Sequence, residues 1–160
     1  MIFIGIDPGA KGGVAWIEER LGLDGEILTT QCFPLPETER DIFGLIWKVG
    51  ILKLSDKMLC MCLIEKVHSM PKQGVASSFK FGRNYGFLRG LLVALELCFD
   101  EVTPQRWQKA MGCLSHGDKN VTKQKAQQLF PTMKITHSTA DALLIAEYCR
   151  RTHSNDPLSC

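Results

Sequence analysis

The chain lacks most of the features that mark membrane, secreted or zinc-scaffold proteins. No apolar run approaches the roughly 20 residues of a membrane span, and no basic segment precedes the first apolar run, so we expect neither an anchor nor a signal peptide. There is no CxxC pair, which argues against zinc. We expect an intracellular protein, from a bacterial or phage-infected cell.

No internal repeat, low-complexity tract or linker divides the 160 residues. We therefore expect one domain over 1–151 and a loose tail over 152–160. The chain has 7 cysteines, an odd number that cannot all pair with one another, and most of them lie in apolar stretches. This pattern indicates reduced cysteines in the core. The net charge of +2 excludes neither a nucleic acid nor a neutral ligand.

Apolar patterning predicts an α/β domain with a mixed five-stranded sheet. The continuous apolar run over 2–6 is typical of a strand covered on both faces. Strands over 12–17 and 26–33, joined by a turn at 23–25, should complete an antiparallel meander. Two further strands, over 59–67 and 99–103, are expected to be parallel. Helices are predicted over 37–54, 74–97, from Pro104, over 122–130 and over 138–151.

Acidic side chains stand at the ends of these apolar elements. Asp7 and Glu65 follow the apolar parts of two strands; if these strands are parallel neighbours, their ends lie about 5 Å apart at the edge where open α/β sheets place ligands. Asp141 begins an apolar helix, and His137, four residues earlier, can face the same way. Each of the four alone is equally consistent with a cap, a surface ion pair or an exposed helix start.

Taken together, three carboxylates without a matching basic cluster would repel one another, and a shared divalent cation resolves that repulsion. Oxygen-rich sites favour Mg²⁺ or Mn²⁺. Two ions in one active site would activate a water for in-line attack on a phosphodiester and stabilise the leaving 3′ oxygen.

Three glycines repeat every four residues in the predicted helix over 74–97: Gly82, Gly86 and Gly90. This spacing places them on one helix face, where another backbone can approach closely. Close packing within the chain is one interpretation, and a homodimer contact is the other.

A set of short motifs resembles those of the RuvC family of Holliday junction resolvases, in order and over residues 2 to about 151. The motifs are 4–9 (IGIDPG), 12–15 (GGVA), 64–67 (IEKV), 80–90, 102–109, 123–131 and 140–146 (ADALLIA). The resemblance implies an RNase H-like fold: three antiparallel strands, then two parallel ones, flanked by helices. It also implies a homodimer whose subunits each nick one strand of a four-way DNA junction with Mg²⁺ or Mn²⁺, with or without a branch-migration partner.

The resemblance implies Asp7, Glu65, His137 and Asp141 as catalytic metal ligands. Bacterial members have Asp or His three residues before the last Asp, whereas this chain has Ser138 there and His137 one position earlier. That end motif looks more like the chloroplast and phage-type members. Ser138 is the alternative to His137 as the fourth ligand.

The segment between Glu65 and Asp141 is locally basic, and we expect it to contact DNA phosphates or to form a solvated helix face. The predicted DNA-binding residues are Lys66, Lys72, Lys80, Arg83, Lys109, Lys119, Lys123 and Lys125. In the family, the loop after the catalytic Glu inserts an apolar side chain among unstacked bases. Met70 or Phe79 would serve here, although Phe79 is equally consistent with core packing.

Other functions share parts of this pattern. The segment 6–13 also resembles the phosphate loop of actin-like and sugar-kinase ATPases, but these need two such domains. A pre-ribosomal-RNA nuclease shares the first loop. A broader nuclease that also cuts forks and flaps is an alternative that depends on the geometry of the dimer. A module that binds branched DNA without cutting it would fit if the Ser138 departure disables the metal site.

Overall fold

The computed structural model describes residues 1–22, 25–56, 59–66 and 74–154. The strands are β1 (Ile2–Asp7), β2 (Gly13–Gly22), β3 (Gly25–Pro34), β4 (Cys60–Glu65) and β5 (Cys98–Val102). The helices are α1 (Glu39–Asp56), α2 (Val75–Ala94), α3 (Pro104–Ala110), α4 (Lys119–Leu129) and α5 (His137–His153). Within these ranges, no helix combines the length and apolar character that crossing a membrane requires.

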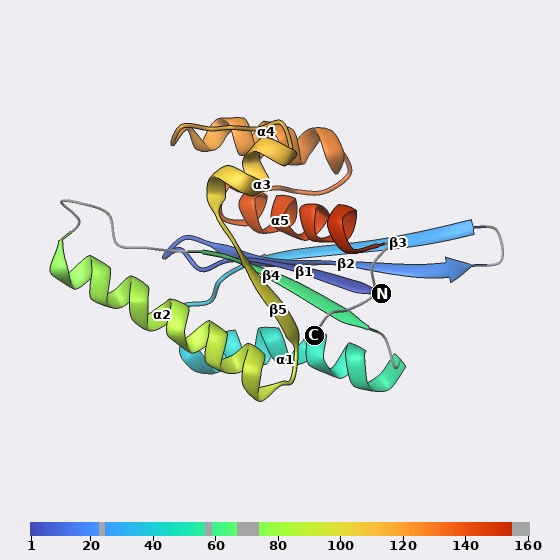
Figure 1. The fold of residues 1–160 in the computed structure, drawn as a ribbon, viewed down its shortest axis with the longest axis horizontal. Helices are drawn as coiled ribbons and strands as arrows, with labels where there is room; N and C mark the ends of the chain where they lie inside the picture. The colour runs from blue at the N-terminus through green and yellow to red at the C-terminus, as the bar shows by residue number, and fades with distance from the viewer. Residues whose placement is uncertain (23–24, 57–58, 67–73, 155–160) are drawn as a thin grey trace.

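The strands form a single mixed sheet in the order β3-β2-β1-β4-β5 (Figure 1). The pairs β1–β2 and β2–β3 are antiparallel, and β1–β4 and β4–β5 are parallel. Three antiparallel strands followed by two parallel ones is the predicted arrangement, which is therefore confirmed. Since Ile6 pairs with Ile64 in the parallel register, Asp7 and Glu65 leave the sheet at the same edge.

Helices cover both faces of the sheet, as Figure 1 shows. One core lies under α5 with α3 and α4 and includes Phe3 of β1; the other lies under α1 and α2 and includes Ile2, Ile4 and Ile6. Alternate residues of β1 thus enter opposite cores. All six residues of β1 are buried, which accounts for its unbroken apolar run.

The backbone of α5 lies directly on β1 at Gly5. A Cβ atom at Gly5 would run into the carbonyl oxygen of Ala142 and the amide nitrogen of Ala146. A side chain at Gly13 would likewise meet the carbonyl oxygen of Ser138. These close approaches bring the first turn of α5, and with it Asp141, to the sheet edge where β1 ends.

We expect Gly5→Ala to lower the free energy of unfolding by about 1–3 kcal/mol, because overpacked backbone must move apart. The matched control is Gly44→Ala on α1, where a Cβ atom meets nothing within 4 Å. That control should be neutral or stabilising by about 0.5–1 kcal/mol. Urea denaturation of both variants provides the measurement, and an unchanged Gly5→Ala protein would refute the close approach.

The structure does not support close packing of the three α2 glycines within the chain. Cβ atoms at Gly82, Gly86 and Gly90 would each meet nothing within 4 Å, so these glycines do not pack closely against the described residues. Phe79 is also outside the core, since 71% of its surface is exposed. The buried residues of α2, Leu88 and Leu92, lie on its other side.

Several boundaries differ from the predicted ones for identifiable reasons. β2 continues past Ile17 to Gly22 because its polar half still pairs with β3. α4 begins at Lys119 rather than residue 122, because the Asp118 side chain accepts a hydrogen bond from the Asn120 amide and caps the helix. α5 continues to His153, past the expected end of the domain at 151. Of that tail, residues 155–160 lie outside the described residues.

The prediction of reduced cysteines is correct for Cys32, Cys60, Cys62, Cys113 and Cys149. It is wrong for Cys98, at the start of β5, which is disulfide-bonded.

Candidate active site

Asp7 is a buried carboxylate at the carboxyl end of β1, with 6% of its surface exposed. The amide of Gly9 donates a hydrogen bond to Asp7 Oδ1 at 2.9 Å, so the Pro8–Gly9 turn holds this side chain. Burial, and after it the charge of Asp141, raises the pKa of Asp7, although the Gly9 hydrogen bond opposes the rise.

Glu65 ends the neighbouring strand β4 and is the second carboxylate at this edge. The indole Nε1 of Trp107 donates a hydrogen bond to Glu65 Oε1 at 2.8 Å. Burial raises the pKa of Glu65 to about 7, with further contributions from the charges of Asp7 and Asp141. A carboxyl group that resists ionisation for these reasons is typical of a functional site.

Asp141 reaches the same edge from the first turns of α5. Its Oδ1 atom is buried and has no hydrogen-bond partner in the described part of the chain. Its charge contributes to the raised pKa values of Asp7 and Glu65, and of the Cys113 thiol. The structure therefore brings together three of the four predicted ligands.

The chemistry of this donor set fits a divalent cation. The charge of Asp141 raises the pKa values of Asp7 and Glu65, and one oxygen of Asp141 has no partner among the described residues, so the three carboxylates gain from a shared positive charge. No group of three His, Cys, Asp or Glu side chains in the described ranges is already arranged to hold a metal ion. An ion that binds all three carboxylates would therefore require at least one of these side chains to turn towards it.

The raised pKa of Glu65 predicts a pH-dependent stability for the metal-free protein. In EDTA, Glu65 binds more protons in the native state than in the unfolded state between pH 4.5 and about 7. Its contribution to the free energy of unfolding is therefore fully present below this window and is lost as the pH rises through it. We expect a loss on the order of 2 kcal/mol between pH 5 and 7.5. Thermal denaturation across this range measures it.

Glu65→Gln should flatten that fall, because the amide does not ionise, and Mg²⁺ should reverse it by binding the ionised carboxylates. An equally steep fall in Glu65→Gln would assign the effect to other groups.

The described residues show no hydrogen bond or ion pair that links His137 or Ser138 to the three carboxylates. His137 is the first residue of α5 and is exposed. The local structure is instead a capping box between Thr136 and Thr139. A ligand role for either His137 or Ser138 stays a prediction.

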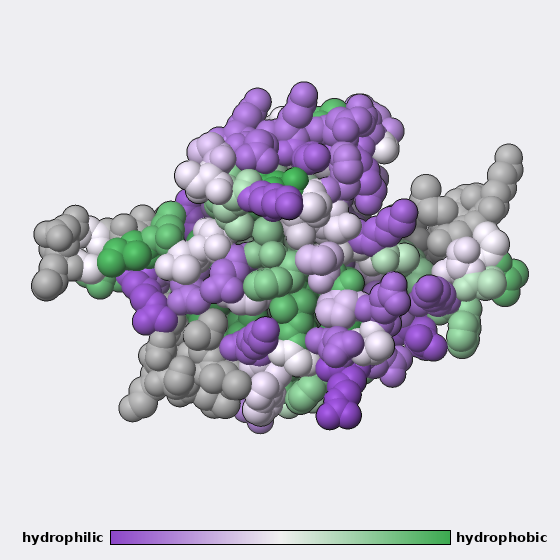
Figure 2. Space-filling model, turned by 180° about the vertical axis from the view of Figure 1, so that it is seen from behind, coloured by the Kyte–Doolittle hydropathy of each residue, from purple (hydrophilic) through white to green (hydrophobic). Residues whose placement is uncertain are grey.

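The predicted DNA-binding residues divide by their surroundings. Lys119, at the start of α4, lies close enough to lower the pKa values of both Asp7 and Glu65. Lys66 is paired with Glu101 at 3.4 Å, and Arg83 with Glu39 at 3.6 Å. Hydrophilic residues cover the α4 end of the molecule, at the top of Figure 2. Others from the predicted set are exposed or half-buried: Lys80, Lys109, Lys123 and Lys125. Lys72, like Met70, lies outside the described residues.

Contacts that the sequence pattern did not reveal hold the ends of β1 and β4. Asn84 of α2 donates from Nδ2 to the carbonyl oxygen of Pro8 at 2.9 Å. On β5, Glu101 accepts a hydrogen bond from Tyr85 at 2.7 Å and pairs with Lys66 and with Arg89. Spacing along the chain carries no signal for such side-chain pairs between elements.

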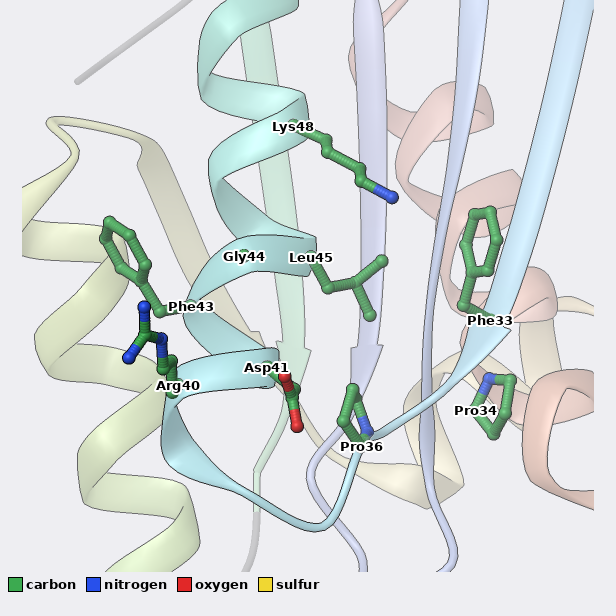
Figure 3. A pocket seen from close by; sticks show the side chains of 9 residues that line it. All are labelled: Phe33, Pro34, Pro36, Arg40, Asp41, Phe43, Gly44, Leu45 and Lys48. Atoms are coloured by element: carbon green, nitrogen blue, oxygen red, sulfur yellow. The ribbon is translucent and has the colours of Figure 1, made fainter.

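A surface cavity of about 590 Å³ lies away from the acids, between α1 and the end of β3. Leu45 and Lys48 point from α1 towards the strands, and Phe43 and Arg40 lie on the α2 side of α1 (Figure 3). None of the predicted site residues lines this cavity. The lining residues are Phe33, Pro34, Pro36, Arg40, Asp41, Phe43, Gly44, Leu45 and Lys48.

The chain matches no protein-family model and no curated protein. Its fold is similar to that of solved structures of RuvC from Thermus thermophilus. One of these has a TM-score of 0.59 at 16% identity, over 97% of this chain and 96% of that chain. Another, RuvC in complex with a Holliday junction substrate, has a TM-score of 0.57 at 16% identity, over 96% and 97%. The predicted RNase H-like fold is thereby confirmed.

Proposed function

We propose that this protein is a divalent-metal-dependent endonuclease that resolves four-way DNA junctions by paired symmetrical nicks. The observation that carries the proposal is the gathering of Asp7, Glu65 and Asp141 at one sheet edge, where burial and mutual repulsion raise the pKa values of Asp7 and Glu65. The similar RuvC structure with a Holliday junction substrate supports branched DNA as the substrate class.

In the proposed mechanism, Asp7, Glu65 and Asp141 hold Mg²⁺ or Mn²⁺, with His137 as the fourth ligand. The bound ions would supply water activation and charge stabilisation at the phosphodiester. The protein contributes position: the Gly9 amide holds Asp7, the Trp107 indole holds Glu65, and α5 carries Asp141. Lys119, whose charge acts on both strand-end acids, would hold a phosphate of the strand that is cut.

We propose further that two copies assemble through α2. Its exposed apolar residues Val75, Phe79 and Val93 are 88%, 71% and 66% exposed, and they follow the spacing of the three glycines along one face. Figure 2 shows apolar residues exposed at the end of the molecule where α2 begins. A stripe with small central residues allows two helices to approach closely, and a symmetrical dimer places two active sites on one junction.

Cleavage of a labelled synthetic four-way junction, beside a fork and a linear duplex, tests the function. We expect paired nicks in opposing strands of the junction in Mg²⁺ and none in EDTA. Junction binding without nicking would indicate a non-catalytic branched-DNA module. Equal cutting of fork and junction would support the metal site and refute the specificity for four-way junctions.

A further inference from the structure

Trp107 is a fully buried side chain that reaches into the acidic site from outside it. It lies in α3, and 0% of its surface is exposed. Its indole Nε1 donates to Glu65 Oε1 at 2.8 Å, across 42 positions of sequence. In the sequence it belongs to the segment 102–109, and Trp107 itself is not among the predicted catalytic or DNA-binding residues.

Burial alone does not account for this contact. Buried indoles usually find a hydrogen-bond acceptor. Trp16, whose surface is 2% exposed, nevertheless has an Nε1 atom without a partner in the described part of the chain. This fold therefore buries one tryptophan without an acceptor, and directs the other to a carboxylate of the acidic site.

An indole is a suitable group for orienting a metal ligand. It donates one hydrogen bond and carries no charge, so it holds the carboxylate without neutralising it. Hydrogen bonds of this kind to ligand side chains tune both the geometry and the affinity of metal sites. In this protein the indole donates its hydrogen bond to Oε1 of Glu65 and not to Oε2.

The two oxygens matter differently to different cations. Ca²⁺ accepts six to eight oxygen ligands and often takes both oxygens of one carboxylate, whereas Mg²⁺ demands near-octahedral geometry. A Glu65 side chain with one oxygen engaged by an indole is therefore better suited to the smaller ion.

We propose that Trp107 is a positioning residue that engages Oε1 of Glu65, presents Oε2 to the metal ion, and thereby favours Mg²⁺ over Ca²⁺. This inference rests on the proposed function for the assignment of Glu65 as a metal ligand. Trp107 itself contacts neither substrate nor metal.

The test compares Mg²⁺ and Ca²⁺ binding by calorimetry in wild-type protein, Trp107→Phe and the control Trp16→Phe, without DNA. In Trp107→Phe we expect Mg²⁺ binding to weaken by about 10- to 100-fold, with a smaller loss for Ca²⁺, so that the preference for Mg²⁺ narrows. Trp16→Phe should keep the wild-type preference. Equal losses for both ions, or no loss, in Trp107→Phe would overturn the proposal.

A second measurement does not depend on the folding of Trp107→Phe. The chain has 3 tryptophans, so ¹⁵N-labelled protein should give three indole N–H signals, and Trp16→Phe and Trp47→Phe identify that of Trp107 by elimination. We expect Mg²⁺ to shift the Trp107 signal in wild-type protein and to leave it unshifted in Glu65→Gln. A Trp107 signal that ignores Mg²⁺ in wild-type protein would overturn the proposal.

The two hypotheses fail separately. Protein that shows the expected binding preference and indole shift without nicking junctions would refute only the nuclease function. Protein that nicks junctions, with a Mg²⁺ preference that Trp107→Phe does not alter, would refute only the role of Trp107.

Discussion

Asp7→Asn is expected to slow junction nicking by at least about 100-fold in Mg²⁺. Loss of a residue that only hydrogen-bonds to a metal ligand typically costs about 10- to 100-fold in activity, and loss of a ligand itself should cost at least as much. The amide keeps an oxygen that can accept the Gly9 hydrogen bond, so the turn after β1 should persist. What disappears is a negative charge at the edge shared with Glu65 and Asp141. Junction binding should be retained, because phosphate contacts come mainly from basic side chains.

The measurement pairs single-turnover cleavage with a gel-shift titration of the same junction in the same buffer. Asp41→Asn, at an exposed carboxylate on α1, is the matched control and should cut at the wild-type rate. In EDTA, Asp7→Asn should also be more stable than wild type near neutral pH, because it removes a buried charge with a raised pKa. A variant that still cuts normally would refute the site.

Gly86→Arg is expected to convert the proposed dimer to a monomer. A Cβ atom at Gly86 meets nothing within 4 Å among the described residues of the same chain, so the helix and the fold should survive. Between two α2 helices, the added charge would be buried without a partner, at a cost of about 3 kcal/mol or more. The dissociation constant of the dimer should therefore rise by at least about 100-fold, and paired nicking should be lost with the dimer.

Light scattering during size-exclusion chromatography reports the change, from twice the chain mass to 17.9 kDa. Gly44→Arg, at an equally open helix position on α1, should remain dimeric. A Gly86→Arg protein that keeps the wild-type mass and nicks in pairs would place the dimer contact elsewhere.

Much of the fold could be predicted from sequence because β1 and β4 are buried on both faces and their apolar runs end abruptly in acids. Parallel pairing then places Asp7 and Glu65 at the same edge of the sheet, and in the observed register Ile6 lies beside Ile64. The position of Asp141 could also be predicted, because the apolar face of α5 must pack on the same sheet.

The rest depends on contacts that no local pattern encodes. A glycine repeat permits close packing without saying against what, so the exposed face of α2 could not be told from a buried one. The Trp107–Glu65 hydrogen bond requires knowing that α3 returns to the end of β4. His137 has the right spacing, but α5 begins there, and an exposed helix start permits orientations that spacing does not choose among.

The glycines of this chain face two kinds of evolutionary constraint. Gly5 and Gly13 are required by the backbone of the same chain, so substitutions there would be removed by selection for folding alone, whatever the protein does. At the open positions Gly82, Gly86 and Gly90, the described residues impose no such requirement. If two copies pair through α2 as proposed, a lineage that ceased to dimerise would replace these three with ordinary helix-forming residues, while selection for folding would still keep Gly5 and Gly13.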